Sequence, residues 1–399
     1  MKKGLLNGMF ALGVCLITMT CSSPAPIQGT ISDWEPDEWN DYIYLIDPGS
    51  WSRLAASYQG TVLDSFQIDE QGRFALPAGR LPRATEPQVW QLALQPEGSE
   101  YLNQLTNEEP DSSNYFPLVY LEGEHIQIEA EAQRFQGSFT IDHPSVANAA
   151  MLQLRDIRHL AFKEYLQEKA AANGLLKQEE ALLNYQNKLF AFAKQTPQLL
   201  PALTAIRWAS IDHYYERVPE ALFAQAQKWK AKAPNHPWVQ ELVARADPDQ
   251  LPLMIGEQIP DAILPILNGD TIAIQNLLAK EITILDLWAS WCAPCRIENR
   301  EVLGPLWEQY HSRGLGILGY ALEAERSIWL SAMRNDNADR WPQASHLNGD
   351  DSPFFQTLGI RTIPANFLID QQGRVLAKNL HGTELEDFIV DFFQKKQEY

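Results

Sequence analysis

The chain has 399 residues, of which 45% are hydrophobic and 10% aromatic, so it can bury more than one core, because single cores stop growing at roughly 250–300 residues. Its formal net charge is −19, and no stripe of clustered Lys and Arg interrupts this acidic composition. Nucleic-acid binding requires such clusters to displace counterions, so we exclude that class of function.

The N-terminus has the pattern of an export signal. Two lysines precede an apolar stretch over residues 9–19, and Cys21 then opens a polar segment. The apolar stretch is too short to span a bilayer, which indicates a signal sequence and not a transmembrane helix. We predict a signal over residues 1–20 and a tether over residues 21–28.

Cys21 and the small polar residues after it resemble the bacterial lipoprotein signal. This resemblance implies that Cys21 is lipidated and becomes the first residue of the mature chain. Residues 18–20 (Thr-Met-Thr) depart from the usual residues before such a cysteine. A conventional cleaved signal with an incidental cysteine therefore remains the alternative, and either interpretation predicts export.

The next region, residues 29–140, has the composition of a β-domain. Runs rich in β-branched and aromatic residues are separated by Gly, Pro, Asn and Asp, which is typical of short antiparallel strands. We predict an antiparallel, sandwich-like domain. The expected strands include residues 42–46, 60–66, 73–76, 89–94 and 125–128.

Residues 141–250 change in character to Ala, Leu, Gln, Lys and Glu, with apolar residues at helical spacing. We predict a helical region that serves as a spacer or a packing layer. After a short linker, strands and helices alternate over residues 253–399, which indicates an α/β sheet flanked by helices. A buried strand is expected at residues 282–288 and a helix from Pro294 to about Tyr310.

Residues 291–295 (Trp-Cys-Ala-Pro-Cys) carry the most distinctive chemistry of the chain. Only two other cysteines occur, Cys15 and Cys21, and both belong to the predicted export region. Cys292 is expected at the start of a helix, where free backbone amides and the helix dipole should lower the pKa of its thiol. Cys292 would then attack a substrate disulfide, and Cys295 would resolve the mixed disulfide.

Three other interpretations of the cysteine pair compete with dithiol exchange. A zinc site needs four ligands, but the chain has no second pair and its histidines are scattered, so we expect no metal and no other cofactor. A disulfide that closes a four-residue loop removes only about 2 kcal/mol of unfolded-chain entropy, which makes it a poor structural brace. A thiol peroxidase would carry Thr-x-x-Cys, whereas Ala289 occupies that position.

Residues 286–296 resemble the active-site stretch of the thioredoxin superfamily. Residues 359–364 (Gly-Ile-Arg-Thr-Ile-Pro) resemble the loop that places a cis-proline opposite the cysteines in this superfamily. The resemblance implies that Pro364 is cis, that the backbone of Ile363 pairs with a bound substrate, and that Cys292–Cys295 is a redox-active disulfide. Residues 259–261 lead into a hairpin, as in the exported TlpA/ResA-like members.

Two carboxylates accompany the cysteine pair. Asp286 lies in the apolar strand where thioredoxins keep a buried Asp, and burial would raise its pKa and suit it to accept the proton of Cys295. Glu298 lies one helical turn beyond Cys295, where ResA-like proteins keep an active-site Glu. The alternatives are an Asp with solvent access and a solvated helix Glu. We predict that Asp286 is the main base.

Three further side chains near the pair have predicted roles. Trp291 resembles the tryptophan that forms a flat apolar surface beside the reactive sulfur, so we expect it to contact substrate. Trp288 is expected in the core. Arg296 is expected to be a solvated helix residue.

The β-region carries a resemblance of its own. Residues 63–66 and 72–74 resemble a domain of unknown function that precedes thioredoxin domains in bacterial envelope lipoproteins. Taken together, the resemblances imply a thiol–disulfide oxidoreductase that faces the periplasm and is held by a lipid anchor. Its expected substrates are protein disulfides or apocytochrome thiols, and its expected electron donor lies upstream in the membrane. A redox-sensing adaptor lipoprotein and a peroxiredoxin-like peroxidase remain the alternatives.

Overall fold

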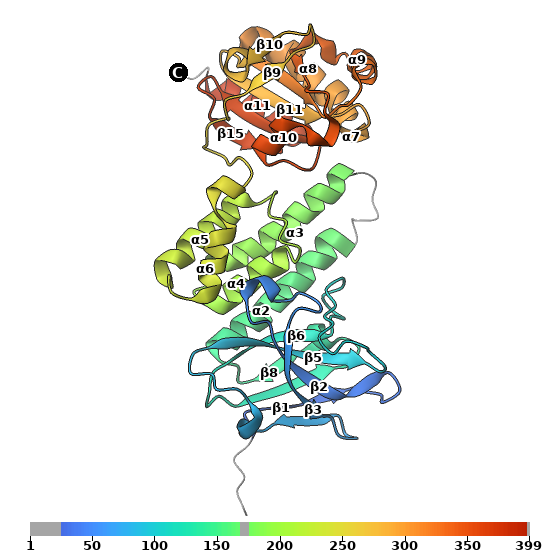
Figure 1. Cartoon of the computed structure of the whole chain (residues 1–399), viewed down its shortest axis with the longest axis vertical. Coiled ribbons are helices and arrows are strands. Elements are labelled where there is room, and N and C mark those ends of the chain that lie inside the picture. Colours follow the sequence, from blue (N-terminus) through green and yellow to red (C-terminus); the bar gives the residue numbers. More distant parts are fainter. Residues whose placement is uncertain (1–24, 168–174, 397–399) are drawn as a thin grey trace, which may run out of the picture.

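The computed structural model describes residues 25–167 and 175–396. A β-rich region, a helical region and an α/β region follow one another along the long axis of the molecule (Figure 1). This order confirms the predicted fold class. The predicted signal, with Cys15 and Cys21, lies outside the described residues.

The β-rich region contains two four-stranded sheets, with strand orders β4-β1-β7-β8 and β3-β2-β5-β6. Neighbouring strands run antiparallel except β1 and β7, which pair in parallel. The strands are β1 (Ile27–Ser32), β2 (Trp39–Asp47), β3 (Thr61–Gln67), β4 (Arg73–Leu76), β5 (Gln88–Pro96), β6 (Tyr115–Tyr120), β7 (Ile126–Glu131) and β8 (Thr140–Asp142), with a short helix α1 (Phe135–Ser138) before β8.

The predicted C-terminal boundary of the tether, at residue 28, is wrong. Ile27 is fully buried and already pairs with Leu76 of β4 and with Ile126 of β7. An apolar side chain that is removed from water on two sides belongs to the core of the β-region. The ordered fold therefore begins before residue 29.

In the described residues, five helices form the middle region, which packs on the β-region. No helix in the described part of the chain combines the length and the apolar character that crossing a membrane requires. The helices are α2 (Val146–Ala161), which continues into a π-helical turn (Phe162–Gln167), α3 (Leu175–Gln195), α4 (Leu199–Ala209), α5 (Pro219–Lys232) and α6 (Pro237–Arg245).

The helical and β-rich regions share one hydrophobic core, which extends from Ile27 to Ala246. Polar side chains cross between the two regions as well. Asn148 of α2 exchanges hydrogen bonds with the backbone of Val119, and the indole of Trp51 donates to the carbonyl of Leu203 at 2.9 Å. The helices are thus a packing layer for the sheets.

A second hydrophobic core, from Leu253 to Phe393, belongs to the α/β region. Its five-stranded sheet has the order β13-β12-β11-β14-β15, with β11 in the centre. The strands are β11 (Ile282–Trp288), β12 (Leu315–Ala321), β13 (Gln343–Ala344), β14 (Ala365–Asp370) and β15 (Val375–Lys378), and a hairpin of β9 (Ile263–Pro265) and β10 (Thr271–Ala273) precedes them.

Helices cover this sheet. The expected helix from Pro294 to about Tyr310 is divided by a π-helical turn at Asn299–Leu303, which separates α7 from α8. The helices are α7 (Ala293–Glu298), α8 (Gly304–Tyr310), α9 (Arg326–Asn335), α10 (Pro353–Leu358) and α11 (Gly382–Lys395).

Candidate active site

Strand β11 leads into the cysteine pair. All seven of its residues are buried, and it pairs in parallel with β12 and antiparallel with β14. Apolar β-branched and leucine side chains at most positions explain why this strand takes the centre of the sheet. Residues 289–292 continue from its carboxyl end and bring Cys292 to the start of α7.

Cys292 and Cys295 form a disulfide with a Cα–Cα distance of 5.3 Å. Cys292 occupies the N-cap position of α7, and its Sγ accepts a hydrogen bond from the backbone N–H of Cys295 at 3.3 Å. Pro294 fits the first helical turn, where a missing N–H costs nothing. Both cysteines are almost completely buried, with 3% and 1% of their surfaces exposed.

The Ile363–Pro364 peptide bond is cis, as the resemblance implies. Strand β14 begins at the next residue, Ala365, which lies opposite Leu287 of β11. Pro364 therefore comes from the same edge of the sheet at which β11 ends and from which the chain continues to Cys292.

The two tryptophans near the pair have opposite environments. Trp288 is fully buried, and its indole N–H donates to Gln343 Oε1 at 3.1 Å. Trp291 is 63% exposed. The indole of Trp291 is thus open to solvent next to the buried disulfide.

Asp286 lies in the middle of the sheet, opposite Gly319 and Asn366 on the neighbouring strands. It is 3% exposed. Burial raises the pKa of Asp286 well above its ordinary value, and the negative charge of Glu298 adds to this effect. The alternative of a strand-end Asp with solvent access is therefore wrong.

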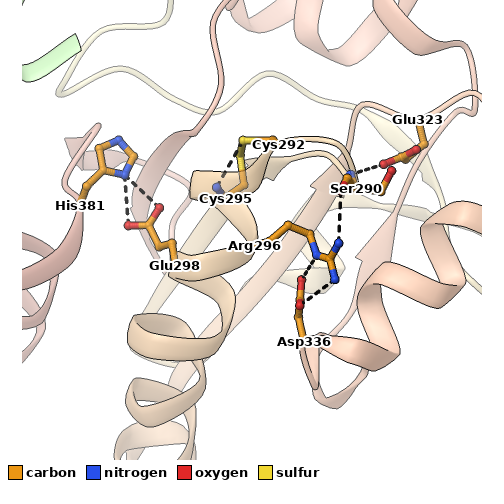
Figure 2. Close-up of a disulfide and its surroundings, with 8 residues drawn as sticks. All are labelled: Ser290, Cys292, Cys295, Arg296, Glu298, Glu323, Asp336 and His381. Atoms are coloured by element: carbon orange, nitrogen blue, oxygen red, sulfur yellow. Dashed lines mark hydrogen bonds and ion pairs between the residues drawn. A yellow bond between two sulfur atoms is a disulfide. The ribbon is translucent and has the colours of Figure 1, made fainter. Parts of the chain in front are cut away.

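Glu298 is also buried, with 4% of its surface exposed, so the alternative of a solvated helix residue is wrong as well. Its carboxylate accepts hydrogen bonds from His381 Nδ1 at 3.0 and 3.1 Å and from the backbone N–H of Gly382 at 3.4 Å. These donors lie at the start of α11 and hold the carboxylate in place (Figure 2).

Arg296 lies on the other side of α7 in Figure 2. Its guanidinium pairs with the buried carboxylate of Asp336, which Arg300 also contacts at 2.7 Å, and Nη1 donates to the carbonyl of Ser290 at 3.3 Å. The backbone N–H of Ser290 donates to Glu323. The expectation of a solvated Arg296 is wrong, because a fully buried carboxylate requires a cationic partner.

Comparison with known proteins agrees with this geometry. The model of the AhpC/TSA family matches residues 255–378. The thiol-disulfide oxidoreductase ResA of Bacillus thuringiensis is 26% identical over 142 residues, which cover 35% of this chain and 78% of that protein. The thiol:disulfide interchange protein DsbE of Pseudomonas fluorescens is 28% identical over 136 residues, which cover 33% and 70%.

The C-terminal region is a thioredoxin-like domain of the AhpC/TSA family. Its relatives are named as thiol–disulfide oxidoreductases, and they support the same enzyme class for this domain. Among solved structures, a thiol-disulfide oxidoreductase of Bacteroides fragilis is 27% identical, with a TM-score of 0.32 and coverage of 34% of this chain and 98% of that one.

The thioredoxin-like domain contains polar residues near the dithiol that sequence reasoning missed. Glu323, Asp336 and His381 follow Cys295 by 28 to 86 positions, and no local motif marks them. Only the fold brings them to α7 and the segment before it. Among the described residues, no three His, Cys, Asp or Glu side chains come together as metal ligands would.

Replacing Asp286 by Asn should stabilise the oxidised protein at neutral and alkaline pH. The pKa of Asp286 is raised above its ordinary value of 3.8 in the folded protein. The bound proton therefore stabilises the folded protein fully below pH 3.8, and this stabilisation is lost as pH rises through the folded-state pKa. We expect a gain of about 1–3 kcal/mol in the free energy of unfolding at pH 8.

Guanidinium unfolding of the oxidised protein at pH 8 and pH 4 checks this prediction, and the gain should be much smaller at pH 4. Asp387→Asn, which removes an exposed carboxylate on α11, is the matched control and should change stability little at either pH. An equal gain at both pH values would show that Asp286 is not held neutral by its environment.

Proposed function

We propose that this protein is an exported thiol–disulfide oxidoreductase that reduces protein disulfides or keeps apocytochrome cysteines reduced before haem attachment. The observation that carries the proposal is the Cys292–Cys295 disulfide at the start of α7, at the same sheet edge as the cis-bonded Pro364. The disulfide closes only a short loop, which favours electron transfer over structural bracing.

The reaction follows from this arrangement. The Cys292 thiolate forms a bond to one sulfur of the substrate disulfide, and the other substrate sulfur leaves as a thiolate and takes a proton from water. The position of Cys292 at the helix N-terminus stabilises its thiolate, as does the N–H of Cys295.

The second step releases the substrate. Cys295 gives its proton to the carboxylate of Asp286 and attacks the Sγ of Cys292, so the mixed disulfide breaks and the remaining substrate thiolate is protonated. Two electrons have then passed to the substrate, and the protein holds the Cys292–Cys295 disulfide. An electron donor of dithiol type, which we place in the membrane, must reduce it again.

We assign the role of base to Asp286 and not to Glu298. A raised pKa brings Asp286 closer to the working pH, where a carboxyl can both accept and release a proton. Glu298 is engaged by His381 and by the backbone of Gly382, which favours a role in fixing the charge near Asp286. The negative charge of Glu298 contributes to the raised pKa of Asp286, which supports this division of roles.

The proposed substrate surface consists of Trp291, Ile363 and Pro364. The exposed indole of Trp291 supplies an apolar platform, and the backbone of Ile363 lies just before the cis-proline, where a substrate strand can form backbone hydrogen bonds. This surface recognises polypeptide backbone, which suits substrates of varied sequence.

Insulin reduction by the exported part of the chain tests the enzyme and its base. Wild-type protein should reduce insulin, and Cys292→Ser should abolish the reaction. Asp286→Asn should lower the rate by about 100-fold, whereas Glu298→Gln should lower it less than about fivefold.

The opposite pattern of the two carboxylate variants would reverse the base assignment. No activity in the wild type would favour the redox-sensing adaptor, and hydrogen peroxide turnover exceeding insulin reduction would favour a peroxidase.

The direction of electron flow has its own test. Ile363 before the proline and the buried Asp286 resemble reducing members of the superfamily, so we expect a reductant. A redox titration of Cys292 and Cys295 against glutathione should give a potential below about −150 mV, because oxidants of the DsbA type lie near −120 mV. A higher value would contradict the reducing role.

Attachment to the membrane is proposed from Cys21. The charged start, short apolar stretch and following cysteine support a lipoprotein signal and a location on the periplasmic side of the envelope. Expression in cells fed radiolabelled palmitate should label the wild type and recover it with membranes. Cys21→Ser should abolish the label, and its retention would exclude lipidation at this cysteine.

A further inference from the structure

The helical region binds the backbone of the cis-proline loop directly. Glu216, just before α5, accepts hydrogen bonds through Oε1 from the backbone N–H groups of Arg361 at 2.9 Å and Thr362 at 3.3 Å. These amides lie three and two residues before Pro364. A carboxylate from the helical region therefore holds the loop that borders the dithiol in the α/β region.

A second carboxylate supports this contact. Glu220 of α5 pairs with Lys378 of β15 at 2.8 Å and accepts a hydrogen bond from the backbone N–H of Ile255 at 3.0 Å. The side chain of Lys378 is only 6% exposed. Burial lowers the pKa of Lys378, and the nearby carboxylates oppose that change. The lysine end of the ion pair is therefore buried, whereas the side chain of Glu220 is 35% exposed.

A cavity of about 500 Å³ lies beside the loop held by Glu216. Arg361 and Thr362 form its wall on the side of the α/β region, and α2, α3 and the chain between α4 and α5 form most of the remainder. Its lining includes the aromatic side chains of Phe162, Tyr185 and Tyr214 together with polar and charged residues. Its volume lies within the range of known ligand sites.

The rest of the cavity lining is largely polar and includes Asn107, Gln186, Arg217 and Arg361. Amide and guanidinium side chains of this kind can hydrogen-bond the N–H and C=O groups of a peptide backbone.

We propose that the protein-substrate site continues from the cis-proline loop into this cavity, which takes a segment of the substrate polypeptide next to its reactive cysteine. The inference rests on the proposed reduction of protein disulfides. Thr362 is two residues from Pro364, a span of at most about 7 Å of chain. A substrate strand paired with Ile363 thus needs only a few more residues to reach the cavity.

The cavity then gives the helical region a function in catalysis. The dithiol supplies electrons, the cis-proline loop aligns the substrate backbone, and the cavity adds binding area that a small disulfide cannot use. Glu216 is a positioning residue in this scheme, because it holds the two backbone amides that connect the loop to the cavity wall.

The test compares two substrates of one protein. Phe162→Ala and Tyr214→Ala should each raise KM for insulin about tenfold with little change in kcat, and should leave the rate with the small disulfide DTNB within about twofold. Leu160→Ala removes an exposed apolar side chain from the end of α2 that does not line the cavity, so it is the matched control and should change neither rate.

Glu216 supplies a second comparison. Glu216→Gln keeps an oxygen acceptor for the amides of Arg361 and Thr362 and should retain most of the insulin activity. Glu216→Ala loses the acceptor and should raise KM for insulin, with an unchanged redox potential of the dithiol.

The outcomes separate this inference from the proposed function. One result is that the wild type reduces both substrates while the cavity variants change neither rate or change both equally. That result would overturn the cavity as a substrate site and leave the proposed oxidoreductase intact. Absence of wild-type activity towards both substrates would overturn the proposed function itself.

Discussion

The complete burial of strand β11 is the constraint on which the site depends. Seven consecutive side chains without access to water fix this strand at the centre of its sheet, between β12 and β14. Its register sets the positions of Asp286 beneath the site and of Cys292 beyond its end, and the pairing with β14 places Pro364 at the same edge. Hydrophobic burial therefore fixes the relative positions of these three chemically different residues.

The same burial determines the electrostatics around α7. Charged groups taken out of water must be paired or neutralised. Glu298 contacts His381 and Asp336 contacts Arg296, and the two pairs lie on opposite sides of the helix (Figure 2). Arg300 is a second partner of Asp336. Asp286 meets it by keeping a raised pKa. The paired groups hold α7 from both sides.

Local sequence patterns were sufficient for the parts of the fold that depend on local physics. Strand β4 was predicted at residues 73–76 with the observed bounds, because alternating apolar side chains and flanking turn residues define it. Strand β6 was not predicted. All six of its residues are buried, so it shows no alternation, and Pro117 argues against a strand. Its position at the edge of its sheet tolerates the missing N–H.

Within the candidate site, too, some residues were predictable from local sequence and others were not. Cys292, Cys295 and Pro364 lie in short motifs whose residue types and spacing specify their geometry, so sequence was enough to find them. The partners of Glu298 and Arg296 were not predictable, because a salt bridge to a residue 40 or more positions away depends on packing between helices. A helix glutamate or arginine has the same sequence pattern whether it is solvated or buried.

The contact between the two cores connects packing to function. It includes a carboxylate that accepts hydrogen bonds from backbone amides and an ion pair whose lysine is buried, and the two hydrophobic clusters remain separate. Polar interfaces of this kind cost little to separate compared with an apolar core. The cis-proline loop belongs to this interface and to the dithiol site alike. Movement between the two cores must therefore break the hydrogen bonds of Glu216 to Arg361 and Thr362 and release the loop beside Pro364.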